Sequence, residues 1–178
     1  MLYKASIKLQ TRYLILLQLY TLTRPAESAT AQWSDIDIES KIWTIYINKG
    51  ITTNDLGIKN KITLSEQAIK LLGEIKKMSG NSEYLFPSIK DPSTHVNTQT
   101  TNAAIKRMGY HGKLVDHGLS SIASTAMNEA EFNTDIIEAA LAHNDQNEVR
   151  RAYNRSTYVE YYKELMVWWG KQVYQRDH

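Results

Sequence analysis

Apolar side chains recur at helical spacing over residues 7–22, which predicts a helix that is buried on most of its sides. The helix should end at Arg24, because Pro25 disfavours helical geometry in the residue before it. A proline also fits the first turn of a new helix, so we expect a short second helix through Ala29. Arg24 is therefore predicted to lie at a tight corner between two helices, where its side chain is held in place.

The spacing changes to alternation after this corner. Residues 33–38 and 41–48 are predicted strands, and in the second strand apolar and polar side chains follow each other with a period of two. The polar residues 52–57 predict a turn, and residues 59–64 return as a partner strand. Together these segments predict a small antiparallel hairpin that carries lysines.

Helical spacing returns at Ser65, which is a suitable N-cap, and the acidic Glu66 favours the positive end of a helix. Residues 79–94 hold two of the three prolines and predict a loop. Further helices are predicted over residues 97–108, 118–130, 134–142, 146–153 and 158–174. The predicted fold class is therefore mainly α with one small antiparallel β-sheet, an α+β arrangement.

Composition fits one folded domain of 178 residues, of which 42% are hydrophobic and 22% charged. The formal charge of +2 is too small to identify a polyanionic partner by itself. Cysteine is absent, which excludes disulfides, thiolate metal sites and a cysteine nucleophile and suits a cytosolic protein. The most apolar stretch, residues 13–22, is shorter than the roughly 20 residues of a membrane helix, and no signal-peptide cleavage site follows it.

Residues with catalytic chemistry are spread along the chain, and each alone has an ordinary explanation. Arg24 suits a surface or capping role, His117 a loop, and His143 a helix end. Tyr153 is one of eleven tyrosines. The order and spacing of these residues, with the segments around them, point to a function. The segments are Thr23-Arg24-Pro25-Ala26-Glu27, Trp33-Ser34-Asp35-Ile36-Asp37, Met108-Gly109-Tyr110, His117-Gly118, Leu141-Ala142-His143-Asn144-Asp145, Arg151-Ala152-Tyr153-Asn154-Arg155 and Trp168-Trp169.

In this order the segments resemble the motifs of the tyrosine recombinases, and most of all the prophage integrases that insert next to transfer-RNA genes. The resemblance covers nearly the whole chain from about residue 14 onward. It implies the tyrosine recombinase catalytic-domain fold. It also implies that residues 1–178 form a single catalytic domain, the C-terminal part of a longer integrase.

The resemblance assigns a role to each of the four residues. Tyr153 would be the nucleophile that attacks a DNA phosphodiester, and Arg24 would clamp the phosphate, because an arginine can bond two of its oxygens at once. His117 would act in acid–base chemistry or phosphate contact, and His143 would donate a hydrogen bond to the same phosphate. The covalent phosphotyrosine conserves bond energy, so religation would need neither ATP nor a metal or other cofactor.

The family also has a catalytic lysine in its hairpin. Lys49, near the end of the first long strand, is our candidate for this position. Lys59 is the alternative, because the length of this hairpin differs from the usual pattern. Either lysine would also have an ordinary role as a solubilising residue of the turn.

One position departs from the family pattern, in which the second motif has the form His-x-x-Arg. Here the motif is His117-Gly118-Leu119-Ser120, and no arginine lies between Arg107 and Arg150. Serine offers one neutral hydrogen bond and no charge. Removing one such transition-state donor typically costs about 10²- to 10³-fold in rate. The substitution leaves three explanations open: a deliberate inactivating change, a decayed prophage gene, or compensation by Arg107, Arg150 or Arg151.

The resemblance implies a site-specific DNA recombinase, encoded by a bacterium or a phage and cytoplasmic, that cleaves and rejoins duplex DNA through a 3′-phosphotyrosine. Its partners would be duplex DNA attachment sites and other integrase protomers assembled on DNA, without a membrane. Ser120 favours an alternative, a catalytically inactive DNA-binding relative. The same residues also suit a relaxing topoisomerase, and a helical interaction module that binds no nucleic acid is the remaining class. The apolar helix predicted over residues 158–174 would either contact a neighbouring protomer or cap its own core.

Overall fold

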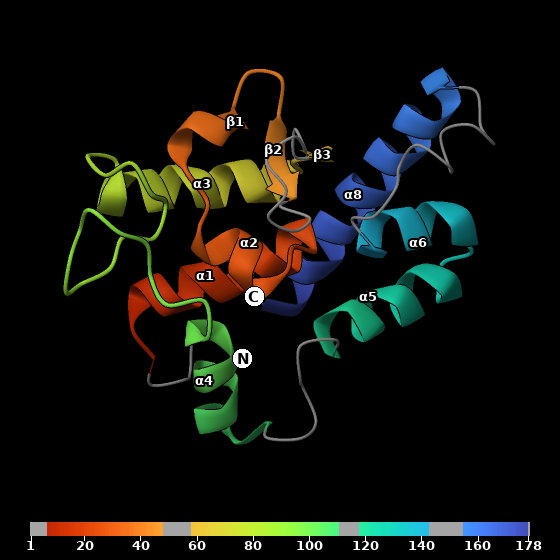
Figure 1. The fold of residues 1–178 in the computed structure, drawn as a ribbon. Coiled ribbons are helices and arrows are strands. Elements are labelled where there is room, and N and C mark those ends of the chain that lie inside the picture. Colours follow the sequence, from red (N-terminus) through yellow and green to blue (C-terminus); the bar gives the residue numbers. More distant parts are fainter. Residues whose placement is uncertain (1–6, 48–57, 111–117, 143–154, 178) are drawn as a thin grey trace.

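Helices form most of the molecule, and one small sheet lies at one side of them (Figure 1). The computed structural model describes residues 7–47, 58–110, 118–142 and 155–177. The α-helices are α1 (Leu9–Thr21), α2 (Pro25–Ala29), α3 (Glu66–Ser79), α4 (Thr100–Ile105), α5 (Gly118–Glu129), α6 (Thr134–Ala142) and α8 (Arg155–Asp177). The strands are β1 (Ile36–Asp37), β2 (Ile42–Ile47) and β3 (Ile58–Thr63). The predicted turn at 52–57 and the predicted helix at 146–153 lie outside the described residues.

The three strands form an antiparallel sheet in the order β1-β2-β3. Trp43 in the central strand pairs with Ile36 on one side and with Ile62 on the other. Trp43 and Ile62 are both buried, as the alternating pattern predicts for one face of a sheet. The predicted hairpin is therefore confirmed.

The prediction of a strand from residue 33 is wrong for its first three residues. Trp33–Asp35 form a 3₁₀ turn, closed by the Asp35 N–H, which donates to the Gln32 carbonyl at 3.2 Å. The Trp33 N–H donates to the carbonyl of Glu83 at 3.0 Å, so this segment pairs with the loop after α3. Only Ile36–Asp37 are left to pair with β2.

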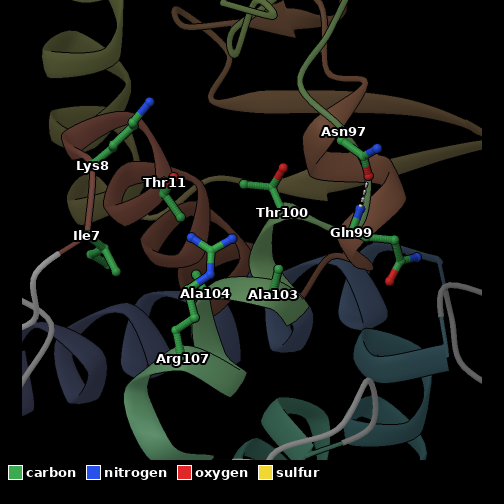
Figure 2. Close-up of a pocket in the computed structure, with 9 residues that line it drawn as sticks. All are labelled: Ile7, Lys8, Thr11, Asn97, Gln99, Thr100, Ala103, Ala104 and Arg107. Atoms are coloured by element: carbon green, nitrogen blue, oxygen red, sulfur yellow. Dashed lines mark hydrogen bonds between the residues drawn. The ribbon is translucent and has the colours of Figure 1, made fainter.

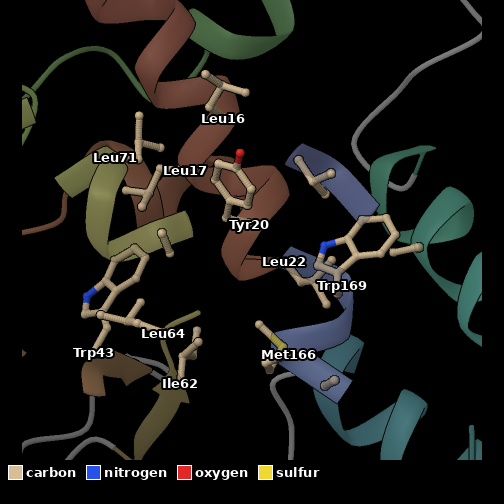
Figure 3. Packing of buried hydrophobic residues seen from close by; sticks show 14 of the residues in the cluster. Leu16, Leu17, Tyr20, Leu22, Trp43, Ile62, Leu64, Leu71, Met166 and Trp169 are labelled. Atoms are coloured by element: carbon tan, nitrogen blue, oxygen red, sulfur yellow. The ribbon is translucent and has the colours of Figure 1, made fainter. Parts of the chain in front are cut away.

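Helix α1 lies at the centre of the molecule and packs against α2, α3, α4 and α8 (Figure 1). This arrangement confirms the prediction of a helix that is buried on most sides. In Figure 3, Leu17 of α1 faces a cluster that includes Trp43 and Ile62 from the sheet and Met166 and Trp169 from α8. Leu17 is 0% exposed, and burying such a side chain contributes roughly 1.5–3 kcal/mol.

Helix α8 packs against the rest of the described chain through its second half. Leu165, Met166 and Trp169 are buried, and the Trp169 indole N–H donates to the carbonyl of Leu19 in α1 at 2.6 Å. Gly170 allows α8 to approach Ser65 at the start of α3, because a Cβ there would lie 2.5 Å from the Ser65 hydroxyl oxygen. The helix thus covers the core of its own chain, which is one of the two roles expected for residues 158–174. None of the described helices is both long and apolar enough to cross a bilayer.

Two predicted helix ends are confirmed. The Ser65 hydroxyl oxygen accepts a hydrogen bond from the Ala68 N–H at 3.3 Å, so Ser65 caps α3 as expected. The helical segment after the loop ends at Gly109, which has φ of 87°, a conformation that favours glycine. This segment starts at Thr100, later than predicted, and its last residues, Lys106–Tyr110, form a π-helical turn.

Candidate functional site

The structure describes two of the six candidate catalytic residues, Arg24 and Ser120. The other four lie outside the described residues, so their convergence around one phosphate stays a prediction; they are Lys49, His117, His143 and Tyr153. The alternative hairpin lysine, Lys59, lies in β3 and pairs with Tyr46 of β2. Arg107 belongs to the π-helical turn after α4.

Arg24 lies at the corner between α1 and α2, as the sequence predicts. Leu22, at the end of α1, has a left-handed backbone with φ of 59°, and it turns the chain out of the helix. Arg24 is extended (φ −69°, ψ 152°), which is the geometry that a following proline imposes. Its side chain is exposed, although its backbone is held in place by the start of α2.

Both backbone polar groups of Arg24 form hydrogen bonds within this corner. The Arg24 N–H donates to the Glu27 carboxylate at 2.7 Å, and the Arg24 carbonyl accepts from the Ser28 N–H at 3.2 Å. The first bond is half of a capping box, in which the third helical residue reaches back to the N-cap. The corner therefore fixes the Cα of Arg24, and the side chain of this residue is exposed at the surface.

Three buried hydroxyl groups, from residues on both sides of Arg24 in the sequence, lie in contact with one another at this corner. The Thr23 oxygen is 2.5 Å from the Ser28 oxygen and 2.9 Å from the Thr21 oxygen. The Thr21 hydroxyl in turn donates to the carbonyl of Leu17 at 2.6 Å. No sequence motif singled out these residues. The only signal for them was the density of hydroxyl side chains on both sides of Arg24, at positions 21, 23 and 28.

Ser120 lies in the first turn of α5 and is half-buried. Positions three and seven residues later lie on the same side of a helix. Ala123 and Met127 occupy these positions, and both are 0% exposed. Ser121, by contrast, is exposed. A side chain at position 120 therefore starts on the side of α5 that faces the rest of the molecule, and one at 121 points to solvent.

A groove of about 530 Å³ lies between the start of α1 and α4 (Figure 2). Two of its lining side chains are cationic, Lys8 and Arg107, and none of its nine lining residues is acidic. The others are Ile7, Thr11, Asn97, Gln99, Thr100, Ala103 and Ala104. This combination of positive charge with neutral amides and hydroxyls suits an anionic ligand that accepts hydrogen bonds.

A buried polar contact holds α4 against α1. The buried Gln18 amide donates to the hydroxyl oxygen of Thr101 at 2.8 Å, across 83 residues of sequence. Both partners lie in helices that are far apart in the sequence, so no local pattern predicts the contact. Within the part of the chain that the structure describes, no cluster of three or more His, Cys, Asp or Glu residues is arranged to hold a metal ion.

Comparisons with known proteins match most of this chain. The phage integrase family model matches residues 1–160. Prophage integrase IntA of Escherichia coli (strain K12) is 49% identical over 173 residues, which are 97% of this chain and 41% of that protein. The integrase of Enterobacteria phage P4 is 33% identical over 175 residues, 92% of this chain and 40% of that protein. The chain thus spans about two fifths of the length of these curated relatives.

Solved structures share the fold. The integrase from mycobacterium phage Brujita has a TM-score of 0.67 at 17% identity, over 93% of this chain and 53% of that chain. XerA recombinase has a TM-score of 0.55 at 19% identity, over 90% and 64% of the two chains. The Tn1549 transposon integrase, solved in complex with circular intermediate DNA, has a TM-score of 0.63 at 13% identity, over 85% and 57%. These likenesses confirm the fold class predicted from the sequence.

Proposed function

The chain belongs to the phage integrase family, and we propose that residues 1–178 are the catalytic domain of a longer site-specific recombinase, its C-terminal part. The observation that carries the proposal is the corner at Arg24. This corner holds an exposed arginine on a fixed backbone, in a chain whose family match extends over residues 1–160. A cation carried on a fixed backbone suits the stabilisation of a phosphoryl transition state, which requires preorganised charge.

In the proposed reaction the Tyr153 hydroxyl attacks a phosphorus of the DNA backbone. A bond forms between the tyrosine oxygen and phosphorus, and the bond to the 5′ oxygen breaks. One of Lys49 and His117 accepts the proton of the Tyr153 hydroxyl and the other gives a proton to the leaving 5′ oxygen, while Arg24 and His143 bond the non-bridging oxygens. Attack of a 5′ hydroxyl on the phosphotyrosine reverses these steps and rejoins the strand. No step requires a metal or another cofactor.

Ser120 determines how fast this reaction runs. A serine at this position provides no charge to the phosphate, so cleavage should be slow unless another arginine substitutes for it. Arg107 lines the groove between α1 and α4, and Arg150 and Arg151 lie outside the described residues. The second candidate function, a DNA-binding relative without cleavage, is favoured by this one substitution.

We also propose that the groove between α1 and α4 contacts the DNA backbone. Lys8 and Arg107 provide the charge, and the amide and hydroxyl side chains around them provide uncharged hydrogen bonds. Such contacts position a protein on a duplex and do not depend on the base sequence. Further partners in this proposal are attachment-site DNA and other protomers assembled on it, in the cytoplasm of a bacterium. The chromosomal target next to a transfer-RNA gene stays a prediction.

Two measurements on the full-length protein test the proposal in sequence. Affinity for a generic duplex, measured against salt concentration, should fall steeply, with a slope that decreases by about 1 for each of Lys8→Ala and Arg107→Ala. A protein that binds no duplex DNA at any salt concentration would be a helical interaction module instead. Incubation with fragmented host DNA, followed by recovery of protein-linked fragments, then tests for cleavage.

The recovered fragments also separate recombination from simple relaxation of DNA. A recombinase should be linked to fragments that share one site, because recombination requires assembly at defined sequences. A relaxing topoisomerase should be linked to fragments without such a site. Binding without any covalent fragment, in the wild-type chain and in Ser120→Arg, would establish the DNA-binding relative.

A further inference from the structure

We infer that the buried hydroxyls of Thr21, Thr23 and Ser28 form a one-directional hydrogen-bond chain that positions Arg24 for phosphate binding. This inference rests on the proposed function, since it concerns how Arg24 reaches DNA. The three residues are positioning residues, because they act through Arg24 and do not themselves contact the phosphate.

The chain of hydroxyls is buried along its whole length. Thr21 is 1% exposed, Thr23 is 7% and Ser28 is 0%. The contacts run from the Ser28 oxygen to Thr23 at 2.5 Å, from Thr23 to Thr21 at 2.9 Å, and from Thr21 to the Leu17 carbonyl at 2.6 Å. The hydroxyls thus link the last turn of α1 to the first turns of α2 across the corner.

The number of hydroxyl protons determines the direction of these bonds. A threonine or serine hydroxyl has one proton to donate, and a carbonyl oxygen can only accept. Thr21 uses its proton on the Leu17 carbonyl, so the bond between Thr21 and Thr23 must use the proton of Thr23. The bond between Thr23 and Ser28 must then use the proton of Ser28. Each hydroxyl therefore donates toward the end of α1, and a single arrangement satisfies all three.

This arrangement fixes Arg24 from both sides. Ser28 holds the side chain of Thr23, the residue before Arg24, and its backbone N–H also donates to the carbonyl of Arg24. Glu27 holds the Arg24 N–H. The backbone of Arg24 is therefore held in place before DNA binds, so less backbone conformational entropy is lost when the guanidinium binds a phosphate.

Stability alone does not require these hydroxyls. Apolar groups of the same shape in place of both members of a buried hydrogen-bonded pair are often nearly neutral for folding. Hydrogen bonds between hydroxyls are directional, whereas apolar contacts are not. The hydroxyls therefore hold the corner at defined oxygen–oxygen distances. The arrangement at Arg24 therefore fits a positioning role, and a purely structural role makes a different experimental prediction.

The experiment is a double-mutant cycle on the full-length protein with Thr23→Val and Arg24→Ala, measured as affinity for duplex DNA at fixed salt. Valine keeps the shape of threonine and removes the hydroxyl. We expect Thr23→Val to weaken binding by about 3- to 10-fold, within the range of coupling between residues of one hydrogen-bond network. In the Arg24→Ala background the same change should have no effect. Thr23→Ser, which keeps the hydroxyl, should restore wild-type affinity.

Equal losses of affinity from Thr23→Val with and without Arg24→Ala would overturn the inference. An unchanged affinity of Thr23→Val in the chain that keeps Arg24 would also overturn it. If Thr23→Val is unfolded at the assay temperature, as judged by a thermal melt, Ser28→Ala takes its place in the cycle with the same expectations. A wild-type protein that binds no duplex DNA would instead refute the proposed function. Binding that Arg24→Ala does not weaken would refute the role of Arg24, and with it the positioning chain.

Discussion

The corner at Arg24 and the first turn of α5 are the two places where the family pattern expects an arginine. At the corner the arginine is present, and hydrogen bonds from Glu27 and Ser28 hold its backbone. In α5 the position is occupied by Ser120, which is half-buried on the side of the helix that also carries Ala123. The first site keeps both the cation and its support, and the second keeps only the helix that would present it.

The comparison of Arg24 with Ser120 indicates that the second site departs from the family pattern in one side chain. Helix α5 begins at Gly118, forms a regular helix and buries Ala123 and Met127 against its neighbours. The described part of this region is thus built to hold position 120 in place, although the residue there provides no charge. We therefore expect that restoring one residue restores function.

Ser120→Arg should increase the yield of covalent protein–DNA adduct by about 10²- to 10³-fold, because it returns one charged transition-state donor. The measurement is adduct formation with DNA fragments in the full-length protein, resolved on a denaturing gel. Ser121→Arg is the matched control, since it adds the same charge to an exposed position of the same helix turn. An equal gain from Ser121→Arg would show that charge matters and position does not.

Ser28→Ala should lower the free energy of unfolding by about 1–3 kcal/mol, because it leaves the buried Thr23 oxygen without its donor. Urea denaturation measures this change. Ser120→Ala, a serine-to-alanine change at the other site, should stay within about 0.5 kcal/mol of wild type. A similar cost at both sites would show that the Ser28 hydroxyl matters no more for folding than the Ser120 hydroxyl.

Glu27→Ala should cost about 0.5–1.5 kcal/mol, the usual net value of one hydrogen bond, since it removes the acceptor of the Arg24 N–H. Glu27→Gln keeps an acceptor oxygen and should cost less. Denaturation of both variants in urea, side by side, checks the order. If alanine and glutamine behave alike, the Glu27 carboxylate does not support the corner.

The smallest effect concerns the segment that leads from the corner into the sheet. Burial raises the pKa of the Asp35 carboxyl, so its stabilising contribution is complete below the unfolded pKa near 3.8 and is lost as the pH rises through the raised value. Asp35→Asn should therefore lack this loss. Between pH 3 and pH 7 the variant should therefore gain unfolding free energy relative to wild type, by at most about 1 kcal/mol because Asp35 is partly solvent-exposed. No change across this range would contradict the direction of the shift.

Local chemistry allowed the sequence to predict the features that depend on neighbouring residues. Pro25 predicted the extended geometry of Arg24, and Ser65 predicted the start of α3. The alternation around Trp43 predicted the face that the sheet buries. Each of these signals acts within a few residues of the structure that it determines.

The features that sequence analysis missed depend on distant partners. The turn at Trp33–Asp35 pairs with Glu83, and the groove with Lys8 exists because α4 folds back onto the start of α1. The hydroxyl chain behind Arg24 needs the angle between α1 and α2, which the spacing of residues does not give. The catalytic residues other than Arg24 and Ser120 lie outside the described residues, so their geometry stays a prediction.

The central claim is that Tyr153 attacks a phosphate that Arg24 holds. Mass spectrometry of the protein–DNA adduct formed by full-length Ser120→Arg tests this claim most directly, because it identifies which of the eleven tyrosines carries the nucleotide. The account predicts that the nucleotide is on Tyr153 and that adding Arg24→Ala removes the adduct. A nucleotide on any other tyrosine, or an adduct that persists undiminished without Arg24, would contradict it.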